Sequence, residues 1–197
     1  ASMRGGDRSF DLGSCERMTE LRCVRICIAK GKLSDETPMV KVWLIQPNGF
    51  KIDDRATGTR GVTTEEALSK GFPVGQVLRE ACNYIKEAYG MGARVTGYNL
   101  NFDATVLRNG MVRAGLAEEA KAWSRMMEDG VCTVHRDIQR WLPEVGKQEG
   151  NQMSGLQKAV KGLILPRYVW MLHFHNNAIV DAVLAWQLCR RSALDCR

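Results

Sequence analysis

The chain has 197 residues, of which 45% are hydrophobic and 25% are charged. These proportions are ordinary for a globular protein and exclude collagen-like, disordered and coiled-coil chains. No run of the sequence approaches the roughly 20 apolar residues that a membrane-spanning helix needs, so no membrane partner is expected. The net charge of +6 suits a polyanionic partner and suits a merely soluble surface equally well.

The cysteine pattern predicts an intracellular, reducing compartment, either the cytoplasm or the nucleus. The seven cysteines are odd in number and scattered through apolar segments, which argues for free thiols. Cys23 and Cys27 are four residues apart, but no Cys/His pair follows them at zinc spacing. We interpret residues 1–8 as a tail or cloning scar without a signal-peptide core, and residues 9–197 as a single domain.

The first half of the domain is predicted to begin with strands. Ser9–Leu12 is a short strand candidate with a thin apolar signal. Arg22–Ala29 alternates apolar and polar residues, and Met39–Ile45 is rich in β-branched and aromatic residues. The connection Lys32–Pro38 has hairpin length, which predicts that these two strands pair antiparallel.

Helices alternate with short strands in the rest of the chain. In order, the patterns predict a loop over Lys51–Val62, a helix capped by Thr63 or Thr64 and running to Lys70, a helix over Val74–Tyr89, a strand over Arg94–Tyr98, helices over Asn101–Ala114 and Glu118–Met127, a strand over Val131–Val134, a helix over Arg136–Leu142, a helix from Ser154 to near Gly162 and a last helix over Asn177–Ser192. This order predicts an α/β fold with a mixed sheet flanked by helices on both faces.

Three aspartates stand where strands end or helices begin, at positions 11, 103 and 181. Carboxylates beside a core are costly unless a cation meets them, and several that converge would bind hard divalent ions through oxygen. Two such ions, about 3.5–4 Å apart, catalyse in-line attack on a phosphodiester. Periodicity alone leaves the alternative that Asp11 is a turn residue, Asp103 an early-helix charge and Asp181 the partner of an arginine.

The local sequences around these aspartates resemble the motifs of the DEDDh exonuclease family. The run Gly97–Asp103, with Leu107, Met111 and Gly115 after it, is similar to the second motif of that family. The run Asn177–Ala182 resembles the third motif, and Phe10-Asp11-Leu12 resembles the beginning of the first. Arg60-Gly61-Val62-Thr63 is similar to the family's His-Gly-Ile-Thr turn.

This resemblance implies an RNase H-like fold and 3′–5′ exonuclease chemistry on DNA or RNA, with single-stranded 3′ ends as the nucleic-acid partner. It implies two Mg²⁺ or Mn²⁺ ions held by carboxylates, and a histidine that takes a proton from the attacking water. The matching carboxylates, as metal ligands and catalytic groups, are Asp11, Asp103 and Asp181. The positions implied in substrate binding are Leu12, Asn99 and Phe102.

Two positions depart from the family pattern. The glutamate expected two residues after Asp11 is Gly13, and Glu16 would face the other side of a strand. The histidine expected five residues before Asp181 is Asn176, which cannot accept a proton from water near neutral pH. His175 is adjacent and would reach the site if the chain bulges by one residue.

Three interpretations therefore remain open: an exonuclease, impaired or not; a degenerate relative that binds nucleic acid or a protein partner without cutting; and a structural module that uses the fold as a scaffold. Gly13 and Asn176 favour the second. Basic residues between Lys158 and Arg191 are candidates for phosphate contacts in the first two.

Overall fold

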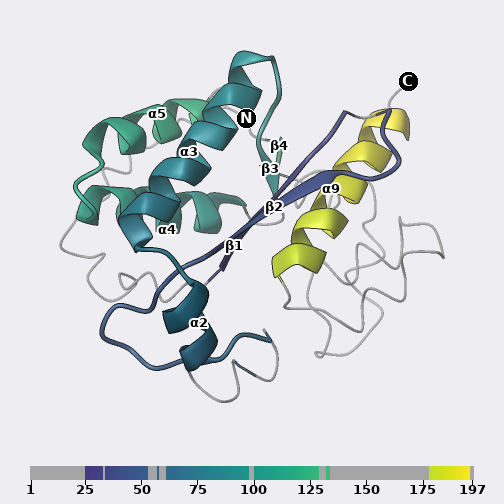
Figure 1. The fold of residues 1–197 in the computed structure, drawn as a ribbon. Coiled ribbons are helices and arrows are strands. Elements are labelled where there is room, and N and C mark those ends of the chain that lie inside the picture. The colour runs from purple at the N-terminus through teal and green to yellow at the C-terminus, as the bar shows by residue number, and fades with distance from the viewer. Residues whose placement is uncertain are drawn as a thin grey trace, which may run out of the picture.

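The computed structural model describes residues 25–32, 34–52, 57, 61–97, 100–128, 132–133 and 178–195. These residues form a mixed α/β arrangement (Figure 1). Its elements are β1 (Arg25–Lys30), β2 (Met39–Leu44), α2 (Thr64–Lys70), α3 (Val74–Gly90), β3 (Thr96–Gly97), α4 (Leu100–Arg113), α5 (Ala117–Glu128), β4 (Cys132–Thr133) and α9 (Ala178–Asp195).

Strands β1 and β2 form the antiparallel hairpin that the sequence predicts. Arg25 pairs with Leu44 at one end and Lys30 with Met39 at the other. Because side chains alternate along a strand, Ile26 and its partner Trp43 share one face, and both are buried. The hairpin therefore presents one apolar face to the helices that follow it.

The second strand pair is parallel and much shorter. Thr96 pairs with Cys132 and Gly97 with Thr133. The strands predicted over Arg94–Tyr98 and Val131–Val134 are thus present, and the described residues pair at Thr96–Gly97 and Cys132–Thr133. In the described part of the chain the two strand pairs are separate two-stranded sheets.

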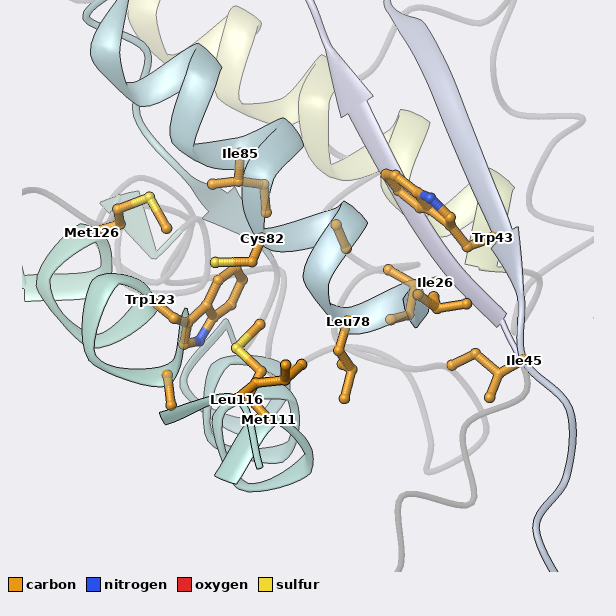
Figure 2. Close-up of a cluster of buried hydrophobic side chains, with 13 residues drawn as sticks. Ile26, Trp43, Ile45, Leu78, Cys82, Ile85, Met111, Leu116, Trp123 and Met126 are labelled. Atoms are coloured by element: carbon orange, nitrogen blue, oxygen red, sulfur yellow. The ribbon is translucent and has the colours of Figure 1, made fainter. Parts of the chain in front are cut away.

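Helices α3, α4 and α5 pack together on the hairpin and enclose the main core (Figure 2). α3 buries one face, with Leu78 fully inaccessible, and α5 contributes Trp123. The Trp123 indole N–H donates a 2.9 Å hydrogen bond to the Ala104 carbonyl oxygen, which fastens α5 to α4. α4 ends before Gly115, whose φ of 72° lies in the left-handed region that glycine tolerates best.

The turn that resembles His-Gly-Ile-Thr has a structural role at the start of α2. Val62 is buried, and the Thr63 hydroxyl accepts a 3.0 Å hydrogen bond from the Glu66 amide, so Thr63 is the N-cap. Gly61 has a φ of 65°, which permits the reversal before the cap. α2, Val62 and Ile52 form a small satellite core.

Helix α9 lies along β1, and in Figure 1 the hairpin runs between α9 and the group α3–α5. The Gln187 side-chain amide is buried and donates a 3.0 Å hydrogen bond to the Glu36 carbonyl oxygen in the hairpin turn. The Trp186 indole packs against Gly31, where a Cβ would stand 3.0 Å from the ring. These two contacts fix α9 against the hairpin.

The predicted helices agree with the observed ones to within a few residues at each end, as expected for helix boundaries. The predicted strand Ser9–Leu12 and the helices over Arg136–Leu142 and from Ser154 lie outside the described residues. None of the helices in the described ranges combines the length and apolar character that crossing a bilayer requires.

Replacing Gly71 with alanine is expected to lower the free energy of unfolding by about 1–3 kcal/mol, because overpacking forces the backbone to shift. A Cβ on Gly71 would meet the Ala67 carbonyl oxygen and lie 2.8 Å from the Gln46 amide nitrogen. Gly90→Ala is the matched control, since a Cβ there meets nothing within 4 Å. Urea unfolding of both variants measures the difference; equal stabilities would contradict the prediction.

Candidate functional site

The structure contains a cavity of about 550 Å³ that is bounded by β1, α3, residues 93–97, α4 and α9. Most of its lining is apolar. Asp103 from α4 and Asp181 from α9 both line it, although the two helices lie far apart in the sequence. Two of the three aspartates singled out by the sequence therefore reach the wall of one cavity.

Asp103 is positioned by the tight connection between β3 and α4. Gly97 lies against Leu100, and a Cβ on Gly97 would stand 3.1 Å from the Leu100 side chain. Leu100 is buried, and Met111 on the same helix enters the main core. With α4 held at these points, Asp103 in its first turn meets the cavity.

Asp181 is positioned by the buried stripe of α9. Leu184 and Leu188 are fully buried, and Ala185 and Trp186 line the same cavity as Asp181. The contacts of α9 with the hairpin fix the helix along its axis. Asp181, one turn before Leu184, is half-buried at the cavity wall as a result.

The environment of Asp103 differs from that of an ordinary surface carboxylate. Asp103 keeps access to solvent, but apolar groups around its carboxyl desolvate it and raise its pKa above the ordinary value. Both aspartates lie in the first turn of a helix, where the helix dipole favours a negative charge. A bound cation would favour the ionised form of Asp103 further.

The carboxylate oxygens of Asp103 and Asp181 are the type of ligand that suits hard divalent cations, because Mg²⁺ and Mn²⁺ prefer carboxylate oxygen. Within the described ranges, no group of three or more His, Cys, Asp and Glu side chains is arranged to hold a metal ion. Asp103 and Asp181 would supply two ligands, and a complete site requires more oxygen donors. Asp11 is the sequence candidate for the next ligand.

The other predicted site residues are not placed by the structure. Asp11, Leu12, Asn99, His175 and Asn176 lie outside the described residues. Phe102 belongs to α4, but its side chain is not described. The convergence of the full predicted set is therefore still a prediction.

The structure adds basic residues that the sequence reasoning did not single out. Arg25, Lys30 and Arg94 line the cavity together with the two aspartates. Lys30 and Lys41 also lie over the rings of Tyr84 and Trp43. The alternation of β1 and β2 would have placed both lysines on the face toward α3, but only the tertiary packing reveals the aromatic partners.

No family model matches this sequence, and no curated protein matches it significantly.

Proposed function

We propose that this chain is a DEDDh-type 3′–5′ exonuclease domain that acts on the ends of single-stranded DNA or RNA with two divalent metal ions. The observation that carries the proposal is the presence of Asp103 and Asp181 in the lining of one cavity. The same two residues stand at the matching positions of the second and third exonuclease-like motifs in the sequence.

An RNase H-like fold is part of this proposal. It is supported by an antiparallel hairpin followed by helices and then by a parallel strand pair. In such a sheet a further strand joins the two pairs, and Ser9–Leu12 is the sequence candidate. That strand would bring Asp11 close to Asp103 and Asp181.

The proposed chemistry divides between the metal ions and the side chains. Asp103 and Asp181, with Asp11, would hold Mg²⁺ or Mn²⁺, which supply an acidified water and neutralise charge on the phosphate. Arg25 and Arg94, on the same cavity lining, would attract the phosphodiester. His175 is the remaining candidate to accept the proton of the attacking water, because the amide of Asn176 cannot accept it.

The experiment has two measurements. The first is the change in the melting temperature of the protein when Mn²⁺ is added without nucleic acid, and the second is the release of a 3′-terminal label from single strands. We expect Mn²⁺ to raise the melting temperature, because a ligand that binds only the folded state stabilises it. Asp103→Asn and Asp181→Asn should each remove most of that shift. Glu87→Gln, which changes an exposed carboxylate on α3, should leave it intact.

A Mn²⁺ shift that survives both aspartate substitutions would contradict the proposed metal site.

The second candidate function is binding of nucleic acid or a protein without cleavage. It is favoured by Gly13 and Asn176, which replace a metal ligand and a general base in the resemblance. Mn²⁺ binding without release of label would support this second function, and no Mn²⁺ binding at all would favour a scaffold module.

A further inference from the structure

Two lysines converge on one tyrosine ring on the hairpin face that is turned toward α3. The ammonium nitrogens of Lys30 and Lys41 lie 5.3 and 5.1 Å from the Tyr84 ring centroid. Lys41 also lies 4.9 Å from the Trp43 ring, which meets Tyr84 edge-on at 5.7 Å. We call Lys30, Lys41 and Tyr84 the lysine–tyrosine cluster.

The strand register produces this cluster. Lys30 pairs with Met39, and Lys41 pairs with Ile28, so the two lysines and Trp43 fall on the same face of the hairpin. Toward the hairpin turn this face leaves the core, and Met39 is 66% exposed there. The charged ends of both lysines thus lie close to the Tyr84 ring at the margin of the core.

The positive charge of the cluster is only partly balanced by neighbouring carboxylates among the described residues. Among the described residues, neither lysine lies within ion-pair distance of a carboxylate. The nearby Glu80 carboxylate already accepts hydrogen bonds from Trp43, at 3.1 Å, and Gln76, at 3.0 Å. The Glu80 carboxylate interacts electrostatically with Lys41 and offsets part of the positive charge, so a bound anion would balance what remains.

We propose that the lysine–tyrosine cluster binds phosphate groups of single-stranded nucleic acid, as a contact additional to the two cavity aspartates. This inference rests on the proposed function for the choice of polymer. Lys30 and Tyr84 line the same cavity as Asp103 and Asp181, so the cluster and the aspartates belong to one continuous surface. A strand that engages the aspartates can therefore continue to the lysines.

The spacing of the basic residues favours a polymer over a single phosphate. Arg25 and Lys30 line the cavity from opposite ends of β1. At about 3.3 Å per residue the two positions are roughly 17 Å apart, and because side chains alternate along a strand they project from opposite faces of the hairpin, so a single phosphate cannot bridge them. A nucleic-acid strand places a charge at each nucleotide, so one strand can meet both positions.

The test measures binding of a fluorescent oligothymidylate by anisotropy over a range of salt concentrations, in EDTA so that the metal site does not contribute. The variant Lys30→Met with Lys41→Met removes both charges but keeps the side-chain stems over the rings. We expect its affinity at low salt to fall about tenfold, and the salt slope to fall by roughly 1.4, since each phosphate contact on a single strand contributes about 0.7. Lys30→Arg with Lys41→Arg should restore both.

The matched control is Lys70→Met with Lys121→Met, which removes two exposed helical lysines elsewhere on the described surface. An equal loss in control and test variants overturns the proposal, because it would reflect net charge alone. Tighter binding of phosphatidylserine vesicles than of the oligonucleotide, with the same dependence on Lys30 and Lys41, also overturns it in favour of a membrane surface.

A second measurement uses the unaltered chain, so it does not depend on the folding of any variant. Amine-reactive labelling with and without the oligonucleotide should show protection of Lys30 and Lys41 but not of Lys70. Absence of protection at these two lysines overturns the proposal. If oligonucleotide binding depends on Lys30 and Lys41 but Mn²⁺ does not stabilise the protein, the proposal for the lysine–tyrosine cluster is supported and the proposed catalytic function is overturned. A failure of the cluster and a failure of the proposed function can therefore be told apart.

Discussion

Gly13→Glu combined with Asn176→His is expected to raise the rate of 3′-end release by about 10²–10⁴-fold, the usual contribution of general-base catalysis. The new carboxylate adds a charged ligand for a hard cation, and the imidazole can take the proton of the attacking water. Because both groups serve one transition state, the double variant should gain more than the two single variants would separately suggest.

The measurement compares the unaltered chain, the two single variants and the double variant on 3′-labelled DNA and RNA strands in Mn²⁺. Adding Asp181→Asn to the double variant is the control, and it should return activity to background. If the unaltered chain already cuts fast and His175→Ala abolishes cutting, His175 is the base and the chain bulges by one residue before Asp181. A double variant that binds Mn²⁺ but stays inert would favour the interaction module.

Trp123→Ala is expected to lower the free energy of unfolding by about 3–5 kcal/mol, the range for truncating a large buried aromatic residue. Trp123 is only 2% exposed and sits within the main core between α4 and α5 (Figure 2). The substitution leaves a cavity and also removes the indole hydrogen bond to Ala104. Since Ala104 follows Asp103 directly, the loss should also loosen the helix that carries the aspartate.

Urea unfolding followed by circular dichroism measures this effect. Trp123→Phe retains most of the buried ring but not the N–H donor, so it should cost much less. Val112→Ala truncates a side chain on α4 that is 42% exposed and should change stability by less than about 1 kcal/mol. A loss for Trp123→Ala as small as that for Val112→Ala would contradict the prediction.

The parts of the fold that depend on local physics were predictable from the sequence. The β1–β2 hairpin follows from alternation and a short polar connection, and the structure confirms its antiparallel pairing. The amphipathic helix α3 and a threonine cap on α2 likewise follow from side chains a few residues apart, and the structure decides for Thr63 between the two threonines predicted. For these elements the decisive interactions are all close in sequence.

The remaining features depend on contacts between distant segments. Periodicity alone could not bring Asp103 and Asp181 to one cavity, and only the resemblance to exonuclease motifs linked them in advance. The strand predicted over Arg94–Tyr98 pairs in parallel with Cys132 and Thr133, a partner that no local pattern specifies. The lysine–tyrosine cluster needed the placement of α3 on the hairpin, which no local pattern specifies.

The hydrogen bond between Gln187 and Glu36 joins residues 151 positions apart, and this separation sets an order of events during synthesis. A growing polypeptide leaves the ribosome from its N-terminus, so the hairpin and α3–α5 emerge well before α9. Until α9 arrives, Gly31 has no indole against it and Asp103 has no Asp181 opposite. The pair of cavity aspartates is therefore assembled last, and a nascent chain that stalls before residue 178 lacks it.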